Sequence, residues 1–501
     1  MAKQGDIIRA RSVKAEFDNS VRATPNAGNV LVERTMRRLG LRRIAGDHLP
    51  PRPASAVYSS TDIAYSLVAA LLSGGKGLQA GESLRANELD AEVFGLETGL
   101  ATEGTVYNAL CDMAGLERRS FADVHFPAGP SHPSLTLFGT VAEKPRWRRT
   151  VPDKPEAALP SKRKSLADFI GAMAKRCLKA LPHKIVYLDG HVVGFADATQ
   201  LEVRGRCFDA AEVDYKGNKS FQWATFMVGP TIAAQSLEGG AANEAHRLAG
   251  LADSAGPVID NYKGPRGVLM LCDAAYLYDI VLREYEARSW KYIMSANLYR
   301  DTLTRQIAPL NDALWTDLGP DASRKWQASG VTVFKHRFAD WKHETRIVAI
   351  RYMREDEFIW RYTFLATNLG AGDLPKHRVE KYGFGQYIRM LYGTKQAREN
   401  HYKTPLRDLG LHHPPSSRLG VNEVFYALAS AASNIAMVLR YRVVKGEERG
   451  IQLWRLRERY LRLAGRVVRG ARTLKVILFG GGIPSDFQDH WLQTFGEAAL
   501  I

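Results

Sequence analysis

The chain has 501 residues, of which 45% are hydrophobic and 24% charged. This is long enough for two or three domains and ordinary for a soluble globular protein. Its 69 lysines and arginines outnumber its 53 aspartates and glutamates, for a formal net charge of +16. Such an excess favours polyanionic partners through neutralisation of phosphates, although charge alone leaves RNA and membrane surfaces open.

Three further features restrict the class of protein. The four cysteines, Cys111, Cys177, Cys207 and Cys272, have no metal-ligand or redox spacing, so we expect them to be reduced and buried in a cytosolic protein. The first residues lack the apolar core of an export signal. The longest apolar stretch, 424–439, is short for a membrane span and predicts a buried core helix. We therefore expect a cytoplasmic protein without a membrane partner.

The first part of the chain, residues 1–126, predicts a helical DNA-binding region. A basic amphipathic segment at 29–43 precedes helical patterns at 61–72 and 104–116. Small helical units suit recognition in the major groove, and unrelated helical scaffolding would show the same pattern. Residues 127–164 are proline-rich and basic, which predicts an extended linker.

Residues 165–299 and 376–440 predict an α/β core in which strands and helices alternate. The expected strands are 184–190, 220–229, 231–237, 267–276 and 291–298, and the expected helices are 165–181, 241–253 and 277–288. Two of these strands carry an aspartate at or near the end of an apolar run, Asp189 in KIVYLDG and Asp273 in GVLMLCDAAY. The ends of strands are where α/β sheets place their chemistry.

Residues 300–375 predict an antiparallel β unit inserted into this core. Long strands with alternating polarity are expected at 330–338, 344–354 and 357–369. Tryptophans are spread through this unit: Trp315, Trp326, Trp341 and Trp360. Aromatic rings in a basic β unit could stack on unpaired bases, but core packing is the commoner explanation.

The last part of the chain, residues 441–501, predicts a basic helical region. Apolar residues recur at alternating spacings of three and four between Leu453 and Val467, within the Arg-rich segment 440–472. This predicts one helix whose basic outer face is either solvated or directed at phosphates. The segment GGGIP at 480–484 lacks the residues of a phosphate-binding loop and predicts a turn.

The segment 391–403 predicts a helix with a charged stripe. Tyr392, Lys395, Glu399 and Lys403 fall on one narrow face at about 100° per residue. A stripe of this kind is usually solvated surface. Here it follows two strands that end on aspartates, so Glu399 becomes a candidate third acid.

Three carboxylates, Asp189, Asp273 and Glu399, could hold two divalent cations about 3.5–4 Å apart. Such ions would activate an attacking water or hydroxyl and stabilise the leaving oxygen in phosphodiester cleavage. Oxygen ligands favour Mg²⁺ or Mn²⁺ over zinc. Each acid also has a structural explanation: a hairpin turn at Asp189–Gly190, a helix cap at Asp273, and an ion pair along the helix for Glu399.

The acids and the stripe resemble those of DDE transposases of bacterial insertion sequences. One branch of that family has a signature of Tyr, two residues, Arg, three residues, Glu, six residues and Lys. Tyr392, Lys395 and Glu399 match its first three positions, with lysine in place of arginine, and Leu406 stands at the last. The segments YLDG (187–190), LCDAAY (271–276) and FLATNL (364–369) resemble the aspartate segments and the strand that precedes the glutamate helix.

The resemblance implies an RNase H-like core interrupted by a β insertion, with Asp189, Asp273 and Glu399 as catalytic metal ligands for two Mg²⁺ or Mn²⁺ ions. It also implies contacts to DNA from the cationic helix face, to which we assign the residues Tyr392, Lys395, Arg398, Lys403 and Arg407. The implied reaction is cleavage of terminal inverted repeats, often through a hairpin, and strand transfer into target DNA by a homodimeric paired-end complex associated with a bacterial nucleoid. If a hairpin forms, one of the insertion tryptophans could hold a flipped base.

Two alternatives remain from the sequence. The first is a nuclease of the same fold without strand transfer. The second is a catalytically silent DNA-binding protein, or a basic regulator of unrelated fold.

Overall fold

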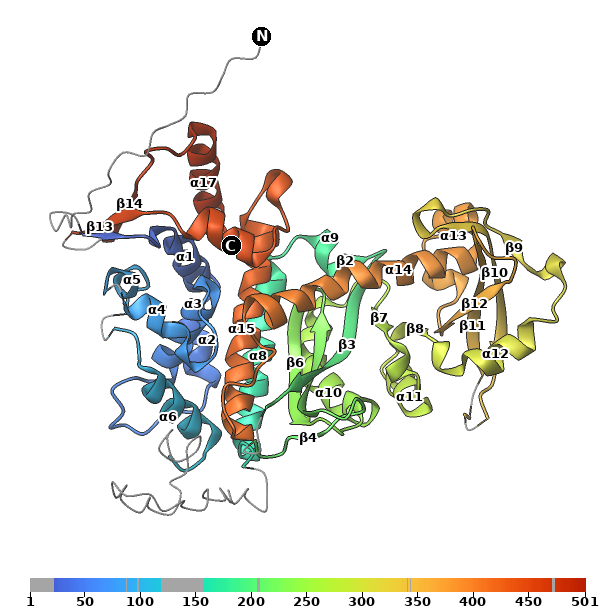
Figure 1. Ribbon diagram of the computed structural model, residues 1–501, viewed down its shortest axis with the longest axis horizontal. Coiled ribbons are helices and arrows are strands. Elements are labelled where there is room, and N and C mark those ends of the chain that lie inside the picture. The colour runs from blue at the N-terminus through green and yellow to red at the C-terminus, as the bar shows by residue number, and fades with distance from the viewer. Residues whose placement is uncertain are drawn as a thin grey trace, which may run out of the picture.

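The structure is a computed structural model, shown as a ribbon in Figure 1. It describes residues 22–86, 88–96, 99–118, 156–204, 208–339, 341–342, 344–470 and 474–501. The side chains of Ser83, Glu244, Ala397, Glu399, Tyr402 and Lys403 lie outside the described part. Most of the predicted linker and Cys207 lie outside it as well, while Cys111, Cys177 and Cys272 are free and buried, as expected.

An 11-stranded mixed sheet runs through the centre of the molecule in the order β4-β5-β3-β7-β8-β12-β11-β10-β9, with β2 paired to β3 and β6 paired to β5. Strands β3, β7 and β8 are parallel neighbours, and the other pairs are antiparallel. The strands are β2 (Tyr187–Leu188), β3 (His191–Glu202), β4 (Glu212–Val213), β5 (Lys219–Val228), β6 (Thr231–Gly239), β7 (Val268–Cys272), β8 (Lys291–Ser295), β9 (Thr316–Asp317), β10 (Trp326–His336), β11 (Thr345–Arg354) and β12 (Arg361–Thr367).

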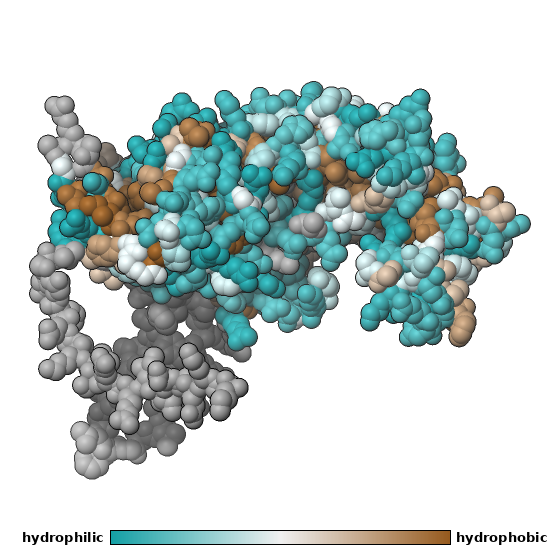
Figure 2. Space-filling model, turned by 90° about the horizontal axis from the view of Figure 1, so that it is seen from above, coloured by the Kyte–Doolittle hydropathy of each residue, from teal (hydrophilic) through white to brown (hydrophobic). Residues whose placement is uncertain are grey.

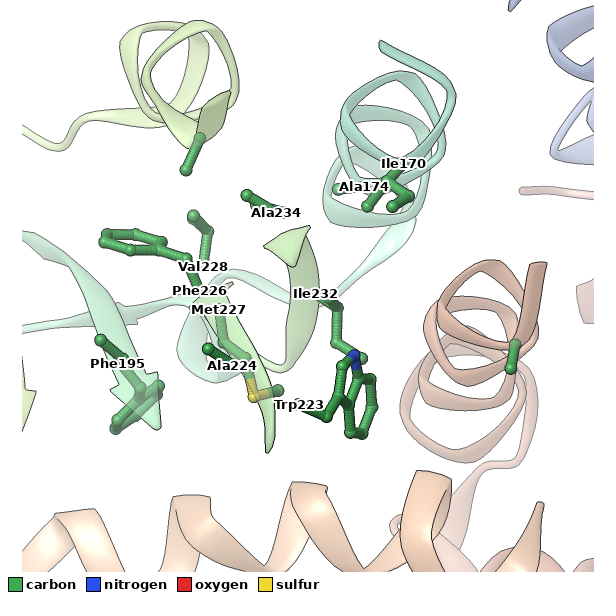
Figure 3. Close-up of a cluster of buried hydrophobic side chains, with 14 of the residues drawn as sticks. Ile170, Ala174, Phe195, Trp223, Ala224, Phe226, Met227, Val228, Ile232 and Ala234 are labelled. Atoms are coloured by element: carbon green, nitrogen blue, oxygen red, sulfur yellow. The ribbon is translucent and has the colours of Figure 1, made fainter. Parts of the chain in front are cut away.

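Helices cover both faces of the first half of this sheet, which explains its continuous apolar runs. They are α8 (Pro160–Ala180), α10 (Glu244–Tyr262), α11 (Asp279–Ala287), α14 (Phe384–Lys403) and α15 (Leu419–Val438). Phe195 and Trp223 lie on one face of the sheet, and Phe226 and Ala234 lie on the other (Figure 3). Trp223 packs against Tyr426 of α15, with ring centroids 5.2 Å apart.

The predicted helix at 424–439 is confirmed as the core helix α15. A stretch from Leu419 to Val443 is long and apolar enough to cross a membrane, but 94% of its apolar window is buried inside the protein. Its polar side chains are used internally, since the Asn434 amide bonds both backbone groups of Ile232 on β6. This helix is therefore explained by packing against the sheet.

The predicted antiparallel strands of the insertion are also confirmed, and they extend the central sheet. Strand β12 pairs with β8 of the parallel part, and β11, β10 and β9 follow in turn. The three long strands begin or end within a few residues of the predicted bounds. This lobe projects at the right of Figure 1. In the space-filling view of Figure 2, a notch separates it from the main body.

Short helices form the N-terminal part, as the periodicity predicts. The segment 29–43 is split at Gly40, whose φ of +74° ends α1 (Val30–Arg38) and starts α2 (Leu41–His48). The patterns at 61–72 and 104–116 are confirmed as α3 (Ser60–Ser73) and α6 (Glu103–Ala114). Both pack against α15, so the N-terminal helices share the core of the sheet domain.

The expected single helix over 440–472 is wrong. Only the helical turn α16 (Leu453–Leu456) and the π-turn η11 (Arg457–Leu461) lie within the periodic part, followed by strand β13 (Gly465–Arg469). Strand β13 pairs with β1 (Ala23–Thr24) and with β14 (Leu474–Leu478), so ladder hydrogen bonds replace helical ones. A final helix, α17 (Ser485–Ala498), follows the turn predicted at 480–484.

The basic face expected in this region is partly neutralised by acids. Arg462 pairs with Glu458, and Arg469 pairs with Glu92 of the N-terminal helices. Arg457 instead turns inward, where it donates to the backbone carbonyls of Leu71, Leu72 and Asp408. Arg457 and Arg469 thus join the C-terminal region to the N-terminal helices.

Candidate active site

The predicted charged helix is confirmed as α14, a 20-residue helix from Phe384 to Lys403. It crosses the molecule from the insertion lobe toward α15 (Figure 1). At its start, Gly385 lies so close to β10 that an added Cβ would come within 2.9 Å of Val331. Near its end, the guanidinium of Arg398 donates to the backbone carbonyl of Ile185. The helix is therefore held over the sheet at both ends.

The middle of α14 faces the carboxyl end of β7. The ammonium Nζ of Lys395 lies 2.8 Å from Oδ1 of Asp273, and the Tyr392 hydroxyl donates to the Cys272 carbonyl at 3.3 Å. Lys395 is 9% exposed, whereas Asp273 is 56% exposed. The part of the stripe that holds Tyr392 and Lys395 is thus turned toward the sheet. This excludes the solvated-surface explanation for these two residues.

Asp189 does not lie at this end of the sheet, so its predicted place beside Asp273 is wrong. The expected strand at 184–190 is instead a helical turn, α9 (His183–Val186), and the two-residue strand β2, after which the chain reverses. Asp189 and Gly190 have φ of +50° and +85°, as a tight hairpin between β2 and β3 requires. The Asp189 carboxylate accepts a hydrogen bond from the Tyr387 hydroxyl.

The strand register gives the separation of these two aspartates. Val192 pairs with Val268, and Asp189 precedes this pair while Asp273 lies five residues beyond it. At about 3.3 Å per residue, Asp189 and Asp273 are at least about 15 Å apart along the strands. Carboxylates that share a pair of metal ions need those ions only about 3.5–4 Å apart. Asp189 therefore cannot share ions with Asp273.

A different aspartate, Asp197, lies beside Asp273. Strands β3 and β7 are parallel, with Val192 opposite Val268 and Gly194 opposite Met270, and the same register carried forward by three residues places Asp197 opposite Asp273. The Cys272 thiol, whose pKa burial raises to about 11, is hydrogen-bonded to the backbone of Ala196, which supports this continuation. Neighbouring strands are about 4.8 Å apart.

Asp197 also points to the side of the sheet that α14 and α15 cover. It shares a face of β3 with Thr199, whose partner Trp223 packs against α15. Asp197 was missed from the sequence because the expected strand 184–190 ended next to Asp189 and no strand was predicted over 191–202. A signal was present: VVGFAD (192–197) and VLMLCD (268–273) are both apolar runs that end on an aspartate.

The third predicted acid and one of the predicted cations are only partly described. Glu399 lies on α14 one turn after Lys395, but its side chain and that of Lys403 are outside the described residues. Arg407 is exposed in the π-turn η8 (Thr404–Asp408) that follows the helix and contains Pro405. Burial lowers the pKa of Arg398 to about 10.

In the residues whose side chains the structure describes, no group of three or more histidines, cysteines, aspartates or glutamates could hold a metal ion. Glu399 is not among those residues. Asp197 and Asp273 are oxygen donors on neighbouring strands, with Glu399 on the helix above them. This donor set fits Mg²⁺ or Mn²⁺, because both prefer carboxylate oxygens.

A cavity of about 310 Å³ opens beside Asp273, between α14 and the insertion strands. Asp273, Tyr392 and Lys395 form one wall, and Arg324, Trp326 and Arg389 lie on its insertion side. It is open to solvent and lined by both charged and aromatic groups. A polymer chain that entered it would reach the aspartate end of β7.

The insertion tryptophans have partners within the lobe. Trp326 stacks on Tyr352, with ring centroids 4.3 Å apart and an interplanar angle of 15°. Trp315 packs against Tyr362, Trp341 packs against Phe338, and Trp360 lies under the guanidinium of Arg351. Packing therefore explains all four, and only Trp326 lines the cavity beside Asp273.

Comparison with known proteins adds one match. The family model of transposase DDE domain group 1 matches residues 233–488, which is 256 of the 501 residues. The match includes Asp273 and α14 but begins after β3, so it covers neither Asp189 nor Asp197. None of the curated proteins matches the chain. Since the family model covers half of the chain, the protein belongs to the family of transposases with a DDE domain, whose members normally use divalent metals and act on DNA.

Proposed function

We propose that this transposase cleaves DNA at the ends of an insertion sequence and joins them to target DNA, with Asp197, Asp273 and Glu399 as its three acids. The observation that carries the proposal is the register of β3 and β7, which places Asp197 opposite Asp273. Helix α14 lies over that edge and carries Glu399 one turn beyond Lys395. Asp197 takes the place first expected for Asp189.

The sheet supports an RNase H-like core. The antiparallel hairpin β5–β6 lies beside the three parallel strands β3, β7 and β8, and helices cover both faces. The insertion then follows β8 and returns to the core at α14. This is the arrangement that the resemblance to insertion-sequence transposases implies.

Asp197, Asp273 and Glu399 would hold two Mg²⁺ or Mn²⁺ ions. Bound there, the ions would lower the pKa of the attacking water or hydroxyl and stabilise the leaving oxygen. The other side chains of the site would position the acids and the DNA. Lys395 pairs with Asp273, and Tyr392 holds the end of β7 through the Cys272 carbonyl. Arg407, exposed in η8 just after α14, would contact DNA phosphates.

The test uses a duplex that carries the inverted repeat flanking the coding sequence. Replacing Asp273 or Glu399 by alanine should abolish Mg²⁺-dependent cleavage of this duplex and leave binding, measured by mobility shift, largely unchanged. The matched control is Asp279→Ala, which removes another aspartate that closely follows β7 but is paired with Arg283 on α11. Cleavage retained by Asp273→Ala would refute the proposed site.

A nuclease of the same fold without strand transfer is the second candidate. The family match favours transposition, but the two acids and their helix would serve hydrolysis equally well. An assay for joined products separates the two: precleaved ends, target DNA and Mg²⁺ should give joined strands only if the chain is a transposase. Sedimentation of the complex with paired ends tests the homodimer that we propose with it.

A further inference from the structure

We propose that Arg324 and Arg389 form a second phosphate-binding subsite, which holds the DNA strand at a phosphate next to the reacting one. The inference rests on the proposed function, because the reacting phosphate is taken to lie at Asp273. Neither arginine belongs to the Tyr-Lys-Glu stripe. Both line the cavity of about 310 Å³ that opens beside Asp273.

The two arginines come from separate elements and meet on one aromatic ring. Arg389 lies on α14, one turn before Tyr392, and Arg324 ends the short helix η6 (Ala322–Arg324) of the insertion. Their Cζ atoms lie 4.9 and 5.1 Å from the centroid of the Trp326 ring. Trp326 is in turn stacked on Tyr352 of β11. Trp326 therefore serves as a platform that positions guanidinium groups.

Among the described residues, the charge of the pair is compensated by one carboxylate. Both guanidiniums share one carboxylate, Asp321: Nη2 of Arg389 lies 2.8 Å from Oδ2, and Nε of Arg324 lies 3.9 Å from the same oxygen. Burial lowers the pKa of Arg389, and the nearby charge of Arg324 lowers it further. An anion in the cavity would relieve this repulsion, and it would lie between two forks of N–H donors.

The residues that line the cavity favour a backbone phosphate over a base or a free carboxylate. A base would need an open aromatic face, but Tyr352 and the two arginines cover Trp326, which is 8% exposed. A free carboxylate carries a single anionic group, so it would occupy only the arginine side of the cavity and would not reach the opposite wall at Asp273. A backbone phosphate suits it better, because a DNA strand can present one phosphate to each wall.

The first test changes the DNA and leaves the protein native, so its result does not depend on whether a protein variant folds. Each phosphate near the cleavage point is replaced in turn by a neutral methylphosphonate in the terminal-repeat duplex. One replacement beside the scissile phosphate should weaken binding by the native protein about tenfold, which is the contribution of a charged hydrogen bond. If no neighbouring replacement weakens binding, the inference is wrong.

The protein side then identifies the arginines. Arg389→Gln and Arg324→Gln should each lower affinity for unmodified DNA, reduce the slope of log affinity against log salt by about one, and remove the effect of the critical methylphosphonate. The matched control is Arg288→Gln. Arg288 also pairs with a carboxylate, Asp253 at 2.5 Å, and lies 5.7 Å from a tryptophan ring, Trp290, but it lies outside the cavity.

The outcomes separate this inference from the proposed function. If the glutamine variants respond to the methylphosphonate as the native protein does, the subsite is absent, and cleavage that still depends on Asp273 leaves the function standing. If the native protein does not cleave the duplex at all, the proposed function fails, while the binding measurements still decide the subsite.

Discussion

Asp189 and Asp273 have the same setting in the sequence and opposite settings in the structure. Each follows a short apolar run, and each precedes a break in that run. Asp273 lies where β7 ends, under α14, whereas Asp189 lies in a hairpin turn at the other end of the parallel strands. An aspartate after an apolar run therefore marks the ligand-binding edge of the sheet only if that run is a strand of the parallel part, and not if it leads into a hairpin turn.

The largest expected effect on cleavage is the difference between alanine variants of Asp197 and Asp189. Asp197→Ala should reduce Mg²⁺-dependent cleavage by at least about 1,000-fold, because loss of an acid that holds the ions removes several kcal/mol of transition-state stabilisation. Asp189→Ala should keep cleavage within a few-fold of the native rate. The measurement is single-turnover cleavage of the terminal-repeat duplex.

Asp197→Asn keeps the shape of the side chain and is the control for folding, since it should be as inactive as the alanine variant with an unchanged circular dichroism spectrum. If Asp189→Ala proves inactive and Asp197→Ala active, the register argument fails.

A smaller effect is expected from His191, which starts β3 directly after the turn. It is 1% exposed, and burial, with the nearby charge of Arg266, lowers its pKa to about 4. The folded-state pKa is below the unfolded value of about 6.5, so stability is present above pH 6.5 and is lost as pH falls toward 4. The loss should reach about 3 kcal/mol at most.

His191→Leu removes the titrating group, so its free energy of unfolding should fall less steeply with pH than that of the native protein. Urea unfolding at several pH values between 7 and 4 measures this difference. Parallel curves for the two proteins would show that His191 does not titrate in this way.

The smallest effect concerns the turn itself. Asp189→Ala should lower the free energy of unfolding by about 1–2 kcal/mol, because alanine is disfavoured at a positive φ and the hydrogen bond from the Tyr387 hydroxyl is lost. Asp189→Asn should cost less, since asparagine tolerates this backbone conformation. Urea unfolding at neutral pH makes the comparison, and an alanine variant as stable as the native protein would contradict it.

Much of the fold follows from local pattern. The apolar runs of β5, β6, β7 and β8 and the periodicity of α8 and α15 are strong enough to place these elements from sequence. The helix α14 and its stripe were also predictable, because a 3.6-residue period survives whatever the helix packs against.

The errors share a physical cause. In the segment 440–472 the same apolar spacing suits a short helix followed by a strand, and pairing with β1 and β14 selects the strand. Arg398 was placed on the DNA-facing surface, but it donates to the Ile185 carbonyl. In both cases a contact far away in the chain supplies the hydrogen bonds that decide the outcome.

Local sequence pattern was enough to predict an α/β core with a β insertion, an aspartate at the end of β7 and a cationic helix with Glu399 after it. Which aspartate lies beside Asp273 depends on how the strands pair in the folded protein. The reason is that register is a relation between two strands, which no local pattern contains. The pairing of Val192 with Val268 brings Asp197 to the site, and the hairpin at Asp189–Gly190 keeps Asp189 away from it.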